Sequence, residues 1–264
     1  MHMQTQAPDF SNKAYLFPRI NREGKKFGIP TLVVAAALVA ASAACTALVV
    51  CQGPDMRLHT LFVVLAAALA LLAGPFLLLA YGVFLFFRDP ERYPPEDERA
   101  ILSPADGRVC MIVESALPPE LVDALPEGTP ADAKYARVSV FMSVFNVHVN
   151  RMPTAARILK KAHVRGKFLN ASLDKASSEN ERCCYLMQTP GGTIYGVVQI
   201  AGLVAKRIVP FADAGAELAR AERFGLIRFG SRLDVYLPAG TRPEVREGQI
   251  MVAGETVLGR LQSA

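Results

Sequence analysis

Two long apolar stretches lie near the start of the chain, and a polar break separates them. Residues 31–50 are almost wholly apolar, and after the break at 52–57 a second apolar stretch covers residues 58–87. Each is long enough to cross a bilayer, because about 20 helical residues span the hydrocarbon core. The pattern therefore predicts a transmembrane helical hairpin with spans at about 31–51 and 58–80, in which each helix satisfies its own backbone hydrogen bonds.

Other interpretations of the two stretches are possible. The first could be a cleaved signal peptide, but it is long and a second stretch follows at once. In the second, Gly74-Pro75 interrupts the apolar run, and the part after it could lie along the membrane interface. The polar segment 1–30 before the first stretch contains Arg19, Arg22, Lys25 and Lys26, and Arg88 and Arg92 follow the second. This charge distribution predicts the inner membrane, with both ends and the following domain on the cytoplasmic side.

From residue 88 onward the apolar residues come in short runs cut by Gly and Pro, as at 107–113, 136–142 and 193–200. Such runs are typical of strands. The intervening segments 117–134 and 170–182 are polar and lack a period, so we expect loops there, with at most one helical turn in the first. The chain thus predicts a mainly β (α+β) domain over 88–264, sandwich-like or barrel-like.

A faint repeat appears near the end of the chain. Residues 215–222 and 248–255 both read Gly, two residues, an apolar residue, two residues, a small residue and Glu. Paired units of this kind suit the two halves of a small twisted β-sandwich, as in lipoyl carrier domains. A coincidence of common turn residues explains the repeat equally well.

The composition of the chain narrows the classes of binding partner that we expect. The chain of 264 residues is 52% hydrophobic and carries a net charge of +5. With only 8% aromatic residues, no Trp and no run of Lys or Arg, nucleic acid is a poor partner, whereas an anionic membrane surface fits. The five cysteines show no zinc-ligand spacing, so we expect no metal, and their odd number favours a reducing compartment.

The candidate chemistry centres on Gly230-Ser231, which lies between two stretches of alternating apolar residues. The Ser231 hydroxyl could attack the carbonyl of Gly230 and convert the amide into an ester, if the fold strains the peptide and supplies donors for the oxyanion. Taken alone, the pair indicates no more than a turn.

Three further stretches carry candidate groups. Asp106 lies in the turn 103–107, where it could activate a neighbour or simply form the turn. Residues 141–153 read as one strand, on which Val144, Asn146, His148 and Asn150 would share a face. His148 could equally be a hydrogen-bonded structural residue, and Arg151 could meet a phosphate. The segment 166–182 is either a solvated loop or a binding loop.

Five motifs occur in order: Phe87-Arg-Asp-Pro90, Ser103-Pro-Ala-Asp-Gly107, the Phe-Asn-Val-His-Val-Asn-Arg run ending at Arg151, residues 166–175, and residues 228–236. Together they resemble the phosphatidylserine decarboxylases, specifically the shorter bacterial and archaeal type. The resemblance covers essentially all of residues 87–264. It implies a proenzyme that cuts itself between Gly230 and Ser231 into a β chain, 1–230, and an α chain, 231–264.

The resemblance also implies the chemistry. Ser231 would become a covalent pyruvoyl group, on which the amine of phosphatidylserine forms a Schiff base before carbon dioxide leaves. His148 matches a family histidine, and the resemblance implies general acid/base work for it. Asp106 matches the family aspartate. The longer enzymes carry a second histidine where this chain has Arg151, so the base for cleavage is left open between His148 and Asp106.

The resemblance leaves the substrate phosphate and the lipid open. Arg151, Lys167, Lys175 and Arg182 are the phosphate candidates. Implied partners are phosphatidylserine in the membrane, the two chains of one proenzyme, and a possible homo-oligomer. One alternative keeps the chemistry with an ether-linked, archaeal-type phosphoserine lipid. Another is a membrane-anchored carrier modified at Lys206, which lacks the setting that carrier lysines have.

Overall fold

The structure is a computed structural model that describes residues 19–51, 56–130, 132–171, 174, 176–202, 207–228 and 231–262. The chain divides into two compact units, Met1–Pro90 and Glu91–Ala264. Three residues singled out in the sequence, Gly230, Lys175 and Lys206, lie outside the described residues.

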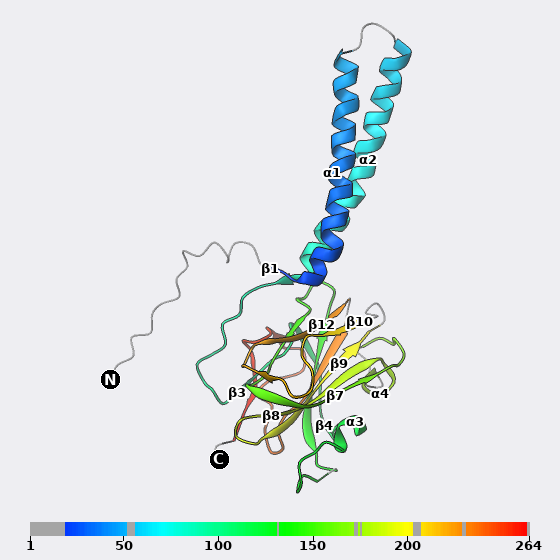
Figure 1. Ribbon diagram of the computed structural model, residues 1–264. Helices are drawn as coiled ribbons and strands as arrows, with labels where there is room; N and C mark the ends of the chain where they lie inside the picture. Colours follow the sequence, from blue (N-terminus) through cyan, green and yellow to red (C-terminus); the bar gives the residue numbers. More distant parts are fainter. Residues whose placement is uncertain are drawn as a thin grey trace, which may run out of the picture. The chain divides into compact units, whose positions relative to one another are not determined.

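The first unit is a helical hairpin. Helices α1 (Arg22–Cys51) and α2 (Met56–Phe86) lie side by side (Figure 1), and the Ser42 hydroxyl donates to the Ala66 carbonyl at 2.8 Å. Both helices are long and apolar enough to cross a membrane. The prediction of two long apolar helices that form a hairpin is therefore confirmed. Helix α2 continues through Pro75, so the Gly74-Pro75 pair does not end it.

Short-range contacts close the base of the hairpin. Strand β1 (Arg19–Ile20) pairs antiparallel with β2 (Arg88–Asp89), which brings the two ends of the hairpin together. Gly24 allows this closure, because a Cβ there would lie 2.3 Å from the Cβ of Phe87. Asn21 begins α1 by accepting the amide of Glu23 on its side chain at 3.0 Å, as an N-cap does.

The second unit consists of strands and two single-turn helices among its described residues. The strands are β3 (Ala100–Leu102), β4 (Gly107–Ser115), β5 (Tyr135–Met142), β6 (Val149–Arg151), β7 (Ala156–Val164), β8 (Arg182–Gln188), β9 (Ile194–Ala201), β10 (Arg207–Pro210), β11 (Glu217–Leu218), β12 (Arg223–Arg228), β13 (Ser231–Tyr236), β14 (Ile250–Met251) and β15 (Val257–Arg260); the helices are α3 (Pro119–Val122) and α4 (Ala176–Glu179).

Two antiparallel sheets share the main core of this unit. As described, one has eight strands in the order β11-β7-β8-β9-β13-β5-β4-β14, and the other has three in the order β10-β12-β6. Ile208, Phe224 and Ile227 of the small sheet join one apolar cluster with Val197 and Leu233 of the large sheet. A pair of sheets packed over a common core is a sandwich, so the predicted mainly β fold is confirmed.

The repeat noticed in the sequence corresponds to a structural repeat within the large sheet. Gly215 and Gly248 have φ values of +89° and +85°. Each then leads into a two-residue strand, and these strands, β11 and β14, form the two edges of the sheet. The amide of Gly215 donates to the carbonyl of Ile158 at 2.8 Å, and the amide of Gly248 donates to that of Val109 at 2.7 Å. The two glycines therefore play the same part in two copies of one motif.

Further details match between the halves β11-β7-β8-β9 and β14-β4-β5-β13. Strands β7 and β4 are each nine residues long. Each shows a register shift near its start, after Ile158 in β7 and after Val109 in β4. Ala221, with φ at +62°, follows Gly215 at the same interval at which Gly254, with φ at +76°, follows Gly248. The eight-stranded sheet is thus two similar halves joined between β9 and β13.

The expected continuous strand over 141–153 is wrong. Strand β5 ends at Met142 and β6 begins at Val149, with a turn between them. The Asn146 side chain causes this break, because its Oδ1 accepts both the amide and the hydroxyl of Ser143, at 2.9 and 2.8 Å. Asn favours such turns because its side chain competes with strand pairing. Val144, Asn146, His148 and Asn150 therefore do not share a strand face.

The polar segment between β7 and β8 is anchored by one buried side chain. Asn180, fully buried, accepts the amide of Leu169 at 3.0 Å and donates to the carbonyls of Leu169 and Ala201, both at 2.8 Å. The segment contains the single turn α4, and Arg182 already belongs to β8. It is therefore attached to the sheet at a defined point, next to the end of β9.

Replacing Asn180 by Ala should destabilise the protein. The change leaves three buried backbone groups without their side-chain partner, and each such group costs about 1–3 kcal/mol, partly offset by relaxation. We expect the midpoint of thermal unfolding, followed by circular dichroism in detergent, to fall by about 5–10 °C. The control is Gln188→Ala, which removes a partly exposed amide whose hydrogen bond to Gly192 is 3.4 Å long. Equal midpoints for the two variants would contradict the anchoring role.

Candidate active site

Ser231 is the first residue of a strand in the middle of the large sheet. It lies opposite Met142 of β5 on one side and Ala201 of β9 on the other. Its side chain is fully buried, and its hydroxyl contacts the sulfur of Met142 at 3.3 Å. A thioether sulfur is a weak acceptor, so this contact leaves the hydroxyl more available than a carboxylate or carbonyl partner would.

His148 lies at the end of the turn before β6 and is 2% exposed. Its Nδ1 is 2.9 Å from the carbonyl oxygen of Asn146. A carbonyl can only accept, so Nδ1 carries the hydrogen in that bond, and Nε2 is the acceptor in the neutral ring. The His148 carbonyl accepts the amide of Ile227 at 3.3 Å, which places His148 beside the end of β12.

Asp106 lies at the same end of the large sheet as Ser231. The next residue, Gly107, packs so closely on β5 that a Cβ would lie 2.1 Å from the carbonyl oxygen of Phe141, the neighbour of Met142. The Asp106 carboxylate is bound by the guanidinium of Arg92, at 2.8 and 3.0 Å, and by the amide of Ala253 at 2.8 Å. Asp106 and Ser231 are separated by the width of strand β5.

The basic candidates occupy different settings. Arg151 is buried and donates to the carbonyl of Ala221 at 3.1 Å. Arg182 is also buried; it pairs with Glu120 and donates to the carbonyl of Ser178 at 2.7 Å. The side chain of Lys167 is 71% exposed and lies 3.0 Å from Glu179. The structure therefore brings Ser231, His148 and Asp106 to one end of the sheets. Arg151 and Arg182 lie at the same end, where both are buried against protein partners.

Sequence reasoning missed a buried ion pair directly after Ser231. Arg232 and Asp234 are both fully buried, with Nε–Oδ1 and Nη2–Oδ2 distances of 2.8 and 3.0 Å. Arg232 also donates to the carbonyl of Ala171 at 3.1 Å and to the hydroxyl of Ser177, whose oxygen donates to Asp234 at 2.9 Å. The signal was present in the sequence, because Arg and Asp interrupt an otherwise apolar strand two residues apart.

A second missed group connects the two sheets. Gln199 of β9 donates to Asn150 of β6 at 2.8 Å and accepts the hydroxyl of Tyr185 at 3.0 Å. Asn150 in turn lies against the Met142 sulfur, at 3.8 Å. Gly225 makes room for this bridge, since a Cβ there would be 2.7 Å from the Gln199 amide nitrogen. Burial raises the pKa of Tyr185, so its hydroxyl stays protonated as a donor.

Two buried cysteines and the acidic residues are further candidates for reactive groups within the described part of the chain. All five cysteines are free thiols. Burial raises the pKa of Cys184 to about 12 and also raises that of Cys183, which keeps both thiols neutral and unreactive. Among the described residues, no group of three or more His, Cys, Asp or Glu side chains could hold a metal ion.

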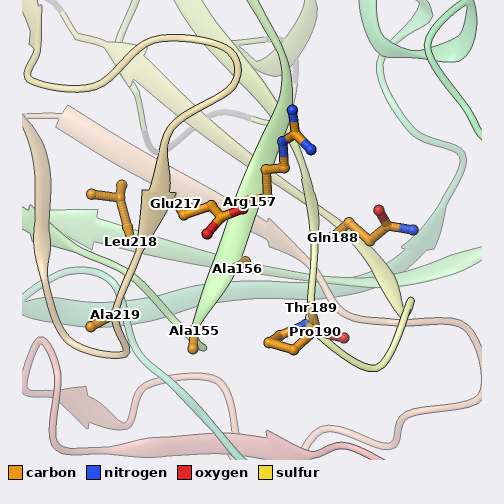
Figure 2. Close-up of a pocket in the computed structure, with 9 residues that line it drawn as sticks. All are labelled: Ala155, Ala156, Arg157, Gln188, Thr189, Pro190, Glu217, Leu218 and Ala219. Atoms are coloured by element: carbon orange, nitrogen blue, oxygen red, sulfur yellow. The ribbon is translucent and has the colours of Figure 1, made fainter.

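A cavity of about 460 Å³ lies at the opposite end of the large sheet (Figure 2). Gln188, which lines it, pairs with Ile194, whereas Ser231 pairs with Ala201 at the other end of the same strand β9. At about 3.3 Å per residue, the two places are about 20 Å apart. In the repeat, Arg157 and Gln188 match Arg108 and Phe141, so the cavity occupies the place that corresponds to the corner beside Asp106 and Met142.

Comparisons with known proteins agree with one another. The sequence model of a family described as "Phosphatidylserine decarboxylase" matches residues 80–259. A protein of Erythrobacter litoralis (strain HTCC2594) named "Phosphatidylserine decarboxylase proenzyme" is 51% identical over 93% of this chain and 89% of its own length. A protein of the same name from Ruegeria pomeroyi is 58% identical over 70% of this chain and 81% of its own length. A protein of the same name from Zymomonas mobilis is 45% identical over 94% of this chain and 89% of its own length.

The buried ion pair after Ser231 yields a stability prediction. Asp234→Ala should destabilise the protein by about 3–5 kcal/mol, because it leaves the Arg232 charge buried without its partner. The double variant Arg232→Met, Asp234→Leu should lose less stability than Asp234→Ala, since it removes both buried charges. Thermal unfolding followed by circular dichroism measures both, with Glu244→Ala, which breaks the exposed pair with Arg260, as the control. A double variant as unstable as the single one would contradict the assignment.

Proposed function

The chain belongs to the phosphatidylserine decarboxylase family, and from this premise we propose that it converts phosphatidylserine to phosphatidylethanolamine and carbon dioxide with a group made from its own Ser231. The observation that carries this proposal is the position of Ser231, buried at the start of a central strand with a weakly bound hydroxyl. Family membership also decides between an enzyme and a carrier modified at Lys206, in favour of the enzyme.

Maturation would begin with the Ser231 hydroxyl. Its oxygen attacks the carbonyl carbon of Gly230, and the nitrogen–carbon bond breaks as an ester forms. Elimination then releases the carboxylate of Gly230 and leaves a dehydroalanine, and water converts this to a ketone with loss of ammonia. The products are a β chain, 1–230, and an α chain, 231–264, which fits the word "proenzyme" in the names of the relatives.

The site of Ser231 suits the resulting pyruvoyl group. The ketone oxygen would replace the serine nitrogen, and a methyl group would replace the hydroxymethyl group, so no additional volume is needed in a position that is fully buried. Hydrogen bonding of β13 to both β5 and β9 would hold the residue that carries it. When formed, the group supplies the electron sink that decarboxylation requires.

His148 is our candidate for general acid/base work on the substrate. Its Nδ1 is bound to the Asn146 carbonyl, which fixes the ring and leaves Nε2 as the atom that exchanges a proton. Protonated, Nε2 returns a proton to the substrate carbon after carbon dioxide leaves. The long, weak bond between the amide of Ile227 and the His148 carbonyl keeps the ring close to the end of β12.

Asp106 has a supporting role in this proposal. Its carboxylate is held by Arg92 and by the amide of Ala253, so its oxygens already accept strong hydrogen bonds. We therefore assign Asp106 to the orientation of the turn before β4. Arg151 and Arg182, which are buried against protein partners, we assign to the scaffold.

The substrate requires a membrane, and the two apolar helices indicate membrane association. We place the catalytic unit on the cytoplasmic side of the inner membrane, because basic residues lie at both outer ends of the hairpin. Arg19 precedes α1, Arg22, Lys25 and Lys26 lie in its first turns, and Arg88 and Arg92 follow α2. An ether-linked phosphoserine lipid would present the same headgroup, and assays with both lipids separate the two. Self-association of the mature protein remains compatible with this proposal.

Ser231→Ala should abolish both steps. Without the hydroxyl no ester can form, so a denaturing gel should show one full-length chain, and phosphatidylserine labelled in its carboxyl group should release no carbon dioxide. Thr193→Ala is the matched control, because Thr193 follows a glycine at the start of β9, in the place that corresponds to Ser231 in the other half of the sheet. An active Ser231→Ala protein would falsify the proposal.

His148→Ala should separate the two steps if the residue acts mainly on the substrate. We expect decarboxylation to fall by about 10²–10⁴-fold, which is the usual contribution of a positioned acid or base, while two chains are still seen on the gel. The control is His163→Ala, since His163 is partly exposed and paired with Glu181 at 3.3 Å. A variant that remains one chain would instead show that His148 serves maturation.

A further inference from the structure

Two arginines lie directly opposite each other near the reactive serine. Arg207 begins β10 and Arg228 ends β12, and the two are cross-strand partners in the small sheet, whose strands β10 and β12 lie side by side in Figure 1. Directly opposed residues of an antiparallel pair share a face and have Cα atoms about 4.5–5.5 Å apart. Like charges in that arrangement repel, and a bound anion between them would relieve the repulsion.

The orientation of the pair leaves it accessible. Ile208 and Ile227, the next cross-strand pair, are buried in the main core. Because side chains alternate between the two faces of a sheet, Arg207 and Arg228 project from the face opposite that core. Arg207 is exposed and Arg228 is half-buried. An anion can therefore reach both guanidinium groups from solvent or from a membrane surface.

Arg228 lies close to Ser231 along the chain. Arg228 and Ser231 are three residues apart in sequence, so their Cα atoms are separated by at most about 11 Å. The phosphate of phosphatidylserine is only a few bonds from the serine amine that reacts. A long arginine side chain can span the remaining distance, and two guanidinium groups offer the paired donors that suit phosphate oxygens.

The surroundings suit a lipid rather than a free anion. The turn between β5 and β6 carries Val144 and Phe145, which are 43% and 74% exposed. By register, this turn extends past the end of β12, because Val149 pairs with Leu226 and the Ile227 amide bonds to the carbonyl of His148. An exposed apolar turn beside two arginines presents one surface for acyl chains and another for the headgroup phosphate.

We propose that Arg207 and Arg228 bind the phosphodiester of the lipid substrate and so set its headgroup over Ser231. This proposal rests on the proposed function and names the residues that recognise the phosphate. It takes the place of Arg151, Lys167 and Arg182 in that role. Arg151 and Arg182 are buried, whereas Arg207 is exposed, and Lys167 is paired with Glu179 at the surface.

The test compares two substrates in neutral phosphatidylcholine vesicles. One is phosphatidylserine, and the other is a long-chain diacylglycerol joined by an ether bond to the side-chain oxygen of serine, which lacks the phosphate but keeps the amine and the carboxylate. The proteins are the wild type, Arg207→Gln, and the control Arg157→Gln, which removes an exposed arginine near the remote cavity. Release of carbon dioxide gives kcat and KM, and a denaturing gel reports whether each chain has been cut.

We expect Arg207→Gln to be cut and to show a KM for phosphatidylserine raised at least tenfold, with kcat within about threefold of the wild type. Its KM for the phosphate-free lipid should match that of the wild type, so the preference for the phosphate should be lost. Arg228→Lys, which keeps a charge but not the paired donors, should lose part of that preference. Arg157→Gln should behave as the wild type with both substrates.

Three results would overturn the proposal. An unchanged preference for the phosphate in Arg207→Gln would exclude a contact with it. An uncut Arg207→Gln chain would place the residue in folding or maturation. Equal losses with both substrates, together with weaker sedimentation on vesicles that contain phosphatidylglycerol, would show a general attraction to anionic membranes. A wild-type protein that is cut but inactive on phosphatidylserine would instead contradict the proposed function.

Discussion

The hydrogen bonding of β13 on both sides is the constraint on which the rest of the site depends. Ser231 begins a strand that is paired with β5 along one edge and β9 along the other for its whole length. Arg232 adds a buried ion pair with Asp234 and contacts with Ala171 and Ser177, so the segment between β7 and β8 is tied to the same strand. The residue proposed to carry the chemistry is therefore held by backbone pairing, while His148 and Asp106 lie in turns at the same end of the sheets.

The repeat within the large sheet places the proposed active corner and the cavity at corresponding positions of two similar halves. Both halves have the same edge strands, the same irregularity near the start of the long strand and the same turns. In one half the corner holds Asp106, Met142 and Ser231. In the other, the matching corner holds Ala155 and Thr189 and opens into a cavity. The scaffold provides the geometry, and a few side chains provide the reactivity.

The sequence was sufficient for the parts of the fold that depend on long or repeated patterns. The hairpin followed from two apolar stretches of about 20 residues or more, and the β domain from short apolar runs divided by Gly and Pro. The turn at 143–148 was not predictable from alternation, because the side chain of Asn146 overrides a pattern that looks strand-like. The role of Gly225 was equally hidden, since it depends on Gln199, which approaches from another sheet.

The proposed cut before Ser231 would create a chain end in the middle of a sheet, which has a consequence for how the enzyme can be made. Strands β9 and β5 could not be expected to leave a gap of the right width for a separately synthesised peptide that begins with a buried residue and places a charged arginine next. Folding as one polypeptide and severing it afterwards avoids that assembly problem. Self-processing is thus a way to create a terminus, with its new reactive group, at a depth that no ordinary terminus reaches.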